Sequence, residues 1–286
     1  MSTLTITTIQ TNLHWEDKAA NLQLIEQKIR SIQERTEIVI LPEMFSTGFS
    51  MQPEKLAEKM DGTTVAWMKN LSAEKKVILT GSLIIEEEGH YYNRLIWMLP
   101  NGQYGFYDKR HLFAYAHEDQ HYTPGNKRLI ASVKGWKVNL QVCYDLRFPV
   151  WSRQQQSVPT VSATGEGDHL HPLLAAGTDN TDKTPEYDLL IYVANWPERR
   201  NHAWKTLLQA RAIENQCYVV GVNRVGVDGK NNNYTGDSSV FGPLGEKIWQ
   251  QSVDVTCHTV TLEKEALQKV RTGLPFLNDA DKFLLL

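Results

Sequence analysis

Cysteine is scarce in this chain, and its placement limits what it can do. The 286 residues include three cysteines, Cys143, Cys217 and Cys257, which are widely spaced and form no C-x-x-C pair. Such spacing argues against a disulfide framework and against a cysteine-rich metal site, and it fits a reducing cytoplasm. We therefore expect a cytoplasmic protein in which one of these thiols is free for chemistry.

Long basic runs and long apolar runs are also missing. The formal net charge is −3 and no cluster of Lys or Arg stands out, so we expect neither a nucleic-acid partner nor binding to an anionic membrane. No apolar stretch approaches the roughly 20 residues of a spanning helix. The N-terminal residues lack the basic start and apolar run of a signal peptide. A hydrophobic content of 41% with 22% charged residues is typical of a folded globular protein.

Apolar periodicity predicts an α/β protein. Helices are expected where apolar residues recur every three or four positions, at 22–32, 63–75, 204–212 and 263–270. Strands are expected at 4–9, 38–41, 77–85, 91–98, 102–108, 129–133, 136–141, 189–194, 217–222, 238–241, 247–249 and 257–262. Strands alternate with helices early and predominate later, which indicates one domain of two or more layers over residues 1–286.

One segment does not fit this pattern. Residues 154–186 are rich in Ser, Thr, Gly, Asp and Pro, and a structureless loop of this length is uncommon inside a compact domain. We interpret it as a surface loop inserted at about 155–186, with a mobile lid as the alternative. His169 and His171 lie within it, but two histidines at i and i+2 without acidic or cysteine partners are a weak metal signal.

Cys143 stands at the end of a predicted strand. Residues 136–141 alternate in character as a half-buried strand does, and Pro149 can open a helix shortly afterwards. A cysteine at such a turn is well placed to present its sulfur to a pocket. Taken alone, it is better explained as a buried thiol that packs as a small apolar residue.

Two residues elsewhere could act with this thiol. Glu43 directly follows the buried strand at 38–41, and strand carboxyl ends are where open α/β sheets bind ligands. Lys109 follows the strand at 102–108, and a lysine near a thiol favours the thiolate and can later stabilise an oxyanion. Singly, each could be a solvated surface residue.

A Cys-His pair is the alternative catalytic arrangement. His111, His117 and His121 are available for it, but the cysteine signature of papain-like proteases is absent around Cys143.

The three segments together resemble the Glu-Lys-Cys motifs of the nitrilase superfamily of carbon-nitrogen hydrolases, in that family's chain order. The motifs are Leu41-Pro42-Glu43-Met44-Phe45, Asp108-Lys109-Arg110-His111-Leu112-Phe113, Val142-Cys143-Tyr144-Asp145-Leu146-Arg147-Phe148-Pro149, Val193-Ala194-Asn195-Trp196-Pro197, Ala210-Arg211-Ala212-Ile213-Glu214-Asn215, and Asn223-Arg224-Val225-Gly226 followed by Thr235-Gly236-Asp237-Ser238. The resemblance extends from about residue 4 to about residue 262. The cysteine and Asn-Trp-Pro motifs look most like the ω-amidases, which release ammonia from the terminal amide of 2-oxo dicarboxylic acid monoamides.

The resemblance implies a fold, an assembly and roles for the matching residues. It implies a four-layer αββα sandwich, usually joined into a homodimer or higher homo-oligomer through its helical faces. Cys143 would be the nucleophile and Glu43 the base, while Lys109 and the backbone N–H of Tyr144 would hold the oxyanion. Glu118 matches a second active-site glutamate of many relatives. The substrate would be a small-molecule amide, and this chemistry requires no metal or organic cofactor.

Arg147 is the candidate for binding the substrate's distal carboxylate, because a guanidinium matches a carboxylate with two parallel hydrogen bonds. The alternative is a scaffold pair with Asp145 or another acid. Trp196 and Phe45 are candidates for the pocket wall, although either could be core. The Arg211 and Glu214 pair, three residues apart on a helix, is interpreted as structural.

Other functions remain open at this stage. Another nitrilase-type amidase, acting on deaminated glutathione or on an N-carbamoyl compound, would use the same catalytic residues. A non-catalytic nitrilase-like binding protein would not need an intact set of Glu43, Lys109 and Cys143. The context of Cys143 is that of the amidase branches, which argues against nitrile hydrolysis.

Overall fold

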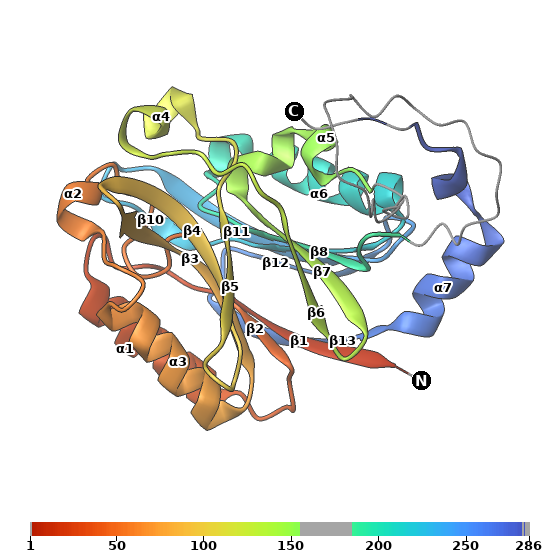
Figure 1. The fold of residues 1–286 in the computed structure, drawn as a ribbon, viewed down its shortest axis with the longest axis horizontal. Coiled ribbons are helices and arrows are strands. Elements are labelled where there is room, and N and C mark those ends of the chain that lie inside the picture. Colours follow the sequence, from red (N-terminus) through yellow and green to blue (C-terminus); the bar gives the residue numbers. More distant parts are fainter. Residues whose placement is uncertain (1, 155–184, 282, 284–286) are drawn as a thin grey trace, which may run out of the picture.

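Two mixed β-sheets lie face to face between helices in the computed structural model, which describes residues 2–154, 185–281 and 283 (Figure 1). The six-stranded sheet has the order β13-β1-β2-β3-β4-β5, and the seven-stranded sheet has the order β10-β11-β9-β8-β7-β6, with β12 paired to β11. The strands of the first sheet are β1 (Thr3–Gln10), β2 (Ile38–Ile40), β3 (Ile78–Glu87), β4 (His90–Met98), β5 (Tyr104–Asp108) and β13 (Thr256–Glu263). Those of the second are β6 (Leu129–Val133), β7 (Trp136–Val142), β8 (Leu189–Val193), β9 (Tyr218–Val222), β10 (Val225–Val227), β11 (Asn233–Phe241) and β12 (Lys247–Ser252).

Each sheet carries a parallel centre with antiparallel neighbours. Strands β1, β2 and β3 are parallel in the first sheet, and β7, β8 and β9 are parallel in the second. Parallel strands need crossover connections, and these place helices on the outer faces. The carboxyl ends of β2, β7 and β8 therefore become the positions from which loops can build a site.

Long helices cover the two outer faces of the sandwich. Helices α1 (Lys18–Ser31) and α3 (Thr63–Lys75) lie on one side, and α6 (Asn201–Asn215) lies on the other (Figure 1). The short helical elements are α2 (Pro53–Leu56), η1 (Ala114–Ala116), α4 (Glu118–His121), η2 (Cys143–Arg147), α5 (Pro149–Ser152), η3 (Glu198–Arg200) and η4 (Phe276–Asp279). The layers confirm the expected four-layer αββα sandwich.

Three apolar clusters hold these layers together. The central cluster lies between the sheets and includes Ile6 and Ile40 from one sheet and Leu140 and Ile191 from the other. A second cluster fills the space between α1, α3 and the first sheet, and a third lies between α6 and the second sheet. Burial of apolar area contributes about 25 cal/mol per Å², so this layered arrangement stabilises the fold and fixes the strand ends.

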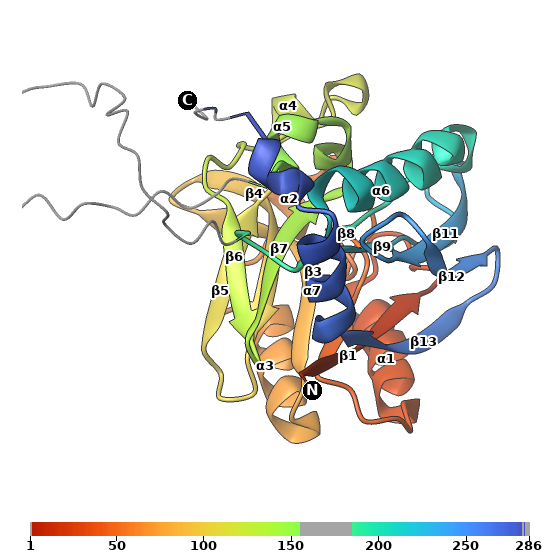
Figure 2. The same ribbon diagram turned by 90° about the vertical axis from the view of Figure 1, so that its right-hand side faces the viewer.

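Helix α7 (Lys264–Gly273) closes one end of the sandwich (Figure 2). Its Leu267 is fully buried in the central cluster. Lys264 and Arg271 on the same helix form ion pairs with Asp188, which directly precedes β8. The end of the chain is thus tied to the strand that leads into the site.

The structure confirms the predicted helices and strands, with boundaries shifted by a few residues. The helix expected after Pro149 is a single turn, α5. Strand β10 and the short helices α2 and α4 were not predicted. Residues 155–184, with His169, His171 and most of the expected insertion, lie outside the described residues. Within the described ranges, no helix is both long and apolar enough to cross a membrane.

Candidate active site

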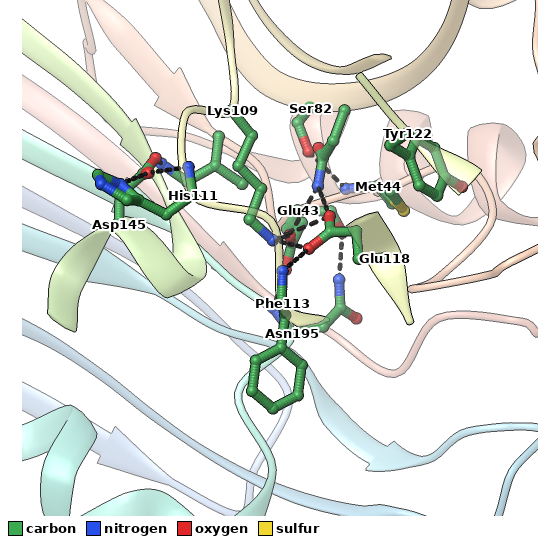
Figure 3. A network of polar contacts seen from close by, with 12 residues as sticks. Glu43, Met44, Ser82, Lys109, His111, Phe113, Glu118, Tyr122, Asp145 and Asn195 are labelled. Atoms are coloured by element: carbon green, nitrogen blue, oxygen red, sulfur yellow. Dashed lines mark hydrogen bonds and ion pairs between the residues drawn. The ribbon is translucent and has the colours of Figure 1, made fainter. Parts of the chain in front are cut away.

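The motif residues stand on turns that follow strands of both sheets. Glu43 follows β2 in the first sheet, Lys109 directly follows β5, and Cys143 directly follows β7 in the second sheet. Because the two sheets face each other, these turns meet at one end of the sandwich. Figure 3 shows Glu43, Lys109 and Glu118 converging there.

Lys109 forms the centre of a buried ion-pair network. Its Nζ lies 2.9 Å from Glu43 Oε1 and 2.8 Å from Glu118 Oε2, and all three side chains are fully buried. Glu118 also accepts a hydrogen bond of 2.6 Å from the backbone N–H of Phe113. Breaking a buried pair by removing one partner leaves an unpaired buried charge, so this geometry is strongly held.

Two asparagines orient Glu43. Asn93 Nδ2 donates to Glu43 Oε1 at 2.8 Å, and the backbone N–H of Asn195 donates to Glu43 Oε2 at 2.8 Å. Asn195 Nδ2 also donates to the backbone oxygen of Glu43 at 2.6 Å. Asn195 follows β8, so these bonds join the carboxylate of one sheet to the other sheet.

The surroundings set the charge states of the network. Burial lowers the pKa of Lys109, but the charges of Glu118 and Glu43 outweigh this effect and raise the pKa above its usual range, so the ammonium form persists. Burial raises the pKa of Glu118, with the Lys109 charge acting in the opposite direction.

Cys143 is held in its thiol form. Burial raises the pKa of the Cys143 thiol well above its ordinary value, the charge of Glu43 adds to this, and Lys109 opposes it. A hydrogen bond between the thiol and Glu43 acts in the same direction as burial. The raised pKa favours the thiol over the thiolate, so ionisation of Cys143 is easier when a nearby base accepts its proton.

The backbone is strained next to Glu43, next to Glu118 and at Cys143. Cys143 has φ of 46°, Met44 after Glu43 has φ of 42°, and His117 before Glu118 has φ of 63°. Non-glycine residues in this left-handed region cost of order 1–3 kcal/mol and persist where the surroundings enforce them. The strain at Cys143 turns the chain sharply out of β7.

Asp145 is the group that enforces the turn. Its Oδ2 accepts hydrogen bonds from Val142 N at 3.0 Å and Tyr107 Oη at 2.8 Å. Its Oδ1 accepts from His111 N at 3.0 Å and lies 2.8 Å from His111 Nδ1. Tyr107 and His111 flank Lys109, so this one carboxylate fastens the cysteine turn to the lysine loop.

A cavity of about 330 Å³ opens beside Cys143. Tyr144, Arg147 and Trp196 lie in its wall, as expected from the sequence. The Arg147 guanidinium lies 5.0 Å from the centre of the Trp196 ring. Arg147 has no recorded acidic partner in residues 2–154 and 185–281, and Asp145 is engaged elsewhere, so the geometry does not support the Arg147–Asp145 pair.

Phe45 is not part of the cavity wall. It is fully buried in the cluster between the first sheet and α1 and α3, where its ring centre lies 5.9 Å from that of Trp67. An ideal Cβ on Gly81 of β3 would lie 2.8 Å from Phe45 Cδ1, which shows how closely the ring packs there. This placement contradicts the expectation that Phe45 walls the pocket.

The histidines are arranged for structure rather than for a Cys-His pair. His111 is bound to Asp145 and stacks on Phe148, with ring centres 3.8 Å apart. His117 lies in the cavity wall, where its Nδ1 is 3.2 Å from Gln120 Nε2. The charged neighbours of Cys143 are instead Glu43, Lys109 and Glu118.

Comparison with known proteins identifies the family of this chain. The model of the carbon-nitrogen hydrolase family matches residues 5–161 and 183–271. The chain belongs to this family. As a carbon-nitrogen hydrolase, it is an amide-hydrolysing enzyme.

Relatives agree over the whole length of this carbon-nitrogen hydrolase. The omega-amidase YafV of Yersinia enterocolitica is 39% identical over 287 residues, covering 100% of both chains. The 2-oxoglutaramate amidase of Bacillus subtilis is 25% identical over 283 residues, covering 98% of both. The crystal structure of XC1258 from Xanthomonas campestris, a CN-hydrolase superfamily protein with an arsenic adduct in its active site, matches with a TM-score of 0.90, 39% identity and full coverage of both chains.

Sequence reasoning missed several residues that position the groups of this hydrolase. Asn93 lies inside β4, where nothing in the strand pattern marks it as a partner of Glu43. Asn195 stands in a motif that was noticed, but its bonds to Glu43 depend on the docking of two sheets. The Arg211–Glu214 pair expected to be structural is present at 3.0 Å, and Arg211 also donates to Leu146 O at the end of the cysteine turn.

Proposed function

We propose that this enzyme is an ω-amidase that hydrolyses the terminal amide of short 2-oxo dicarboxylic acid monoamides, such as 2-oxoglutaramate and 2-oxosuccinamate, to the dicarboxylate and ammonia. The observation that carries the proposal is Lys109 bridging two buried glutamates beside a cavity that contains Cys143. Full-length similarity to proteins named omega-amidase and 2-oxoglutaramate amidase supports the substrate class.

In the first half of the reaction, the sulfur of Cys143 attacks the amide carbon. Since the thiol is protonated at rest, Glu43 takes its proton as the S–C bond forms. The carbonyl oxygen becomes an oxyanion, for which the Lys109 ammonium and the backbone N–H of Tyr144 are the donors. Glu43 then passes the proton to the departing nitrogen, which leaves as ammonia, and a thioester remains on Cys143.

In the second half, water hydrolyses this thioester. Glu43 removes a proton from the water, whose oxygen attacks the thioester carbon, and the proton returns to the sulfur as the C–S bond breaks. The donors at Asn93 and Asn195 keep the carboxylate directed toward the thiol through both halves. Glu118 remains beside Lys109 and balances its charge.

Arg147 is the proposed partner of the substrate carboxylate. It lines the same cavity as Cys143 and has no recorded acidic partner in the described part of the chain. A guanidinium that stacks on an aromatic ring keeps its donors free for a planar anion. This places the amide at one end of the cavity and the carboxylate at the other.

A panel of amides tests the proposal. Ammonia release is measured from 2-oxoglutaramate, 2-oxosuccinamate, deaminated glutathione and an N-carbamoyl amino acid. We expect the highest kcat/KM with the two oxo-acid amides and no measurable turnover in Cys143→Ala. Preference for deaminated glutathione or the N-carbamoyl compound would reassign the enzyme to another amidase branch, and unchanged turnover in Cys143→Ala would overturn the nucleophile.

Assembly and location are part of the same proposal. A homodimer or higher homo-oligomer through the helical faces is supported by exposed apolar side chains there, with Ile213 of α6 and Leu244 each 51% exposed. Light scattering of the purified protein measures the mass directly. A cytoplasmic location is supported by the three cysteines, each of which is free.

A further inference from the structure

Arginine 200 shares the cavity with Cys143 and Arg147 and has been given no role so far. It ends the short helix η3, which follows the Asn195-Trp196-Pro197 motif. Its side chain is half-buried, and its guanidinium lies 5.0 Å from the centre of the Phe113 ring. Neither an ion pair nor a side-chain hydrogen bond is recorded for it within residues 2–154 and 185–281, although a half-buried guanidinium ordinarily has an acidic partner.

Trp196 links this residue to Arg147. The indole Nε1 donates to the backbone oxygen of Arg200 at 2.8 Å, while the Arg147 guanidinium lies over the indole ring. Trp196 is itself fixed by packing on Trp204 and by the hydrogen bond of 2.8 Å from its backbone N–H to Asn223 Oδ1. Trp196 therefore contacts both residues, through the backbone of Arg200 and the guanidinium of Arg147.

In the described part of the cavity wall, no acid is free to pair with Arg200 or Arg147. Burial lowers the pKa of Arg200, and the neighbouring Arg199 and Arg147 charges act in the same direction. The acid in the cavity wall, Asp228, is already engaged by Asn232, Tyr234 and the backbone N–H of Lys230. Arg200 is half-buried and Arg147 is exposed, and two like charges on one cavity wall favour a bound carboxylate between them.

We propose that Arg200 and Arg147 together clamp the carboxylate of the 2-oxo acid, and that Arg200 sets the preference for 2-oxo acid amides over 2-amino acid amides. This inference rests on the proposed function, because it names the group that selects its substrate class. The ammonium of glutamine or asparagine is repelled by the paired guanidinium groups, whereas the oxo group in the same position carries no charge. Arg200 is thus a specificity-determining residue rather than part of the acid–base machinery.

Turnover of matched substrates tests the clamp. Kinetics are compared for the wild type, Arg200→Gln, Arg147→Lys and Arg199→Gln with 2-oxoglutaramate, glutamine and butanamide. Arg199 is the matched comparator, because it borders the same cavity but is exposed, with its guanidinium 6.0 Å from the centre of the Tyr115 ring. Losing a charged hydrogen-bond partner corresponds to roughly a ten- to hundredfold change.

We expect Arg200→Gln to lower kcat/KM for 2-oxoglutaramate by roughly ten- to hundredfold, mainly through a higher KM. The ratio of kcat/KM for 2-oxoglutaramate to that for glutamine should also fall. Hydrolysis of the neutral butanamide should change by less than about twofold, which a general structural defect would not allow. Arg147→Lys should weaken the acidic substrate more than the neutral one, and Arg199→Gln should cause the smaller loss. Equal losses in Arg199→Gln and Arg200→Gln, or equal losses on acidic and neutral amides, would overturn the clamp.

A binding measurement separates this inference from the proposed function. Calorimetry with 2-oxobutyrate, a 2-oxo carboxylate without an amide, is performed on Cys143→Ala and on Cys143→Ala with Arg200→Gln. Affinity that depends on Arg200 supports the clamp even if the wild type releases no ammonia from oxo-acid amides, in which case only the proposed function fails. Affinity that is the same in both proteins overturns the clamp even if the amides are turned over.

Discussion

The carboxylates of Glu43 and Glu118 share the single ammonium group of Lys109. The excess of negative charge helps to explain why the pKa of the Cys143 thiol is raised. Lys109 balances the charge of either Glu43 or Glu118, but it cannot balance both of them and a thiolate as well. A thiolate at Cys143 would add a further negative charge to this buried cluster. Because an unpaired buried charge is costly, the protonated thiol is favoured. In the proposed mechanism, the proton therefore stays on the Cys143 sulfur until the sulfur attacks a substrate carbonyl.

This predicts how the thiol titrates. A free cysteine is half ionised near about pH 8.5, and burial together with the Glu43 charge raises the pKa of Cys143 well above that of a free thiol. The ultraviolet absorbance of the thiolate, taken as wild type minus Cys143→Ala, should therefore be absent at that pH and appear only at higher pH. Cys217 and Cys257 are present in both proteins, so their signals cancel.

A matched variant tests the cause of this shift. After burial, the charge of Glu43 is the next largest cause of the raised Cys143 pKa. Glu43→Gln removes this charge, so the thiolate signal of the variant should appear at a lower pH than in the wild type. A wild-type thiolate that forms below about pH 8, under the free-cysteine value, would contradict a mechanism in which the proton stays on the sulfur until it attacks. An unchanged titration in Glu43→Gln would show that burial alone is responsible.

At this scale the sequence predicted which motif residues lie together better than it predicted the residues that surround them. Glu43, Lys109, Glu118 and Cys143 stand in local motifs, and the structure brings them together. Phe45 was assigned to the pocket because it is close to Glu43 in sequence, but its side chain points into the core. Residues that are neighbours in sequence lie close together, but their side chains can point in different directions because packing sets the direction of each one.

At the scale of elements, the site is made of strand ends, tight turns and short helical turns rather than of the long helices. The turn at Cys143 combines a positive φ with hydrogen bonds from the residues that flank Lys109 to a single carboxylate, Asp145. Periodicity predicted the long helices α1 and α3 and most strands, because each buries one regular face. It could not predict α4, since a four-residue helix shows no full period.

Asp145→Asn should loosen the cysteine turn. The amide keeps the shape of the side chain but presents N–H groups to donors such as Val142 N and Tyr107 Oη, so buried partners lose their acceptor. Each buried group left unsatisfied costs about 1–3 kcal/mol. We expect the free energy of unfolding in urea to fall by about 2–4 kcal/mol and kcat to fall by about a hundredfold, as expected when a reacting group is displaced.

Asp119→Asn is the control for this variant. Asp119 is an exposed carboxylate next to Glu118, so its removal changes the net charge equally without touching the turn. Surface substitutions of this kind usually stay within about 0.5 kcal/mol. If Asp145→Asn retained the stability and kcat of this control, the fastening role of Asp145 would be wrong.

At the scale of the whole molecule, the site exists only when the two sheets are docked. Glu43 belongs to the first sheet, yet it is oriented by Asn195, which follows a strand of the second. The central core between the sheets therefore supports the chemistry as well as the fold. Composition and the alternation of strands and helices predicted an α/β domain. The contact between the turn at Glu43 and the turn at Asn195 joins residues far apart in the chain, and no local sequence pattern predicts it.

Gln154 and Tyr187 lie side by side, although they are 33 positions apart in the sequence. Gln154 Nε2 donates to Tyr187 O at 2.7 Å, Tyr187 N donates to Gln154 Oε1 at 3.2 Å, and Gln154 N is bound to Asn215 of α6 at 2.9 Å. The two family-matched segments end at 161 and resume at 183, so the residues between them lie outside both segments. This junction predicts that the intervening residues can be removed.

Replacing residues 156–184 with a short Gly-Ser linker should preserve the fold, because the ends are already held together and closing a shorter loop costs less entropy. We expect the free energy of unfolding to change by less than about 1 kcal/mol, with kcat/KM for 2-oxoglutaramate and the number of chains per particle in light scattering unchanged. Adding Gln154→Ala to the shortened chain should destabilise it, because the junction then loses both side-chain bonds. A shortened chain that fails to fold, changes its KM or changes the number of chains per particle would show that the segment contributes to the core, the substrate site or the assembly.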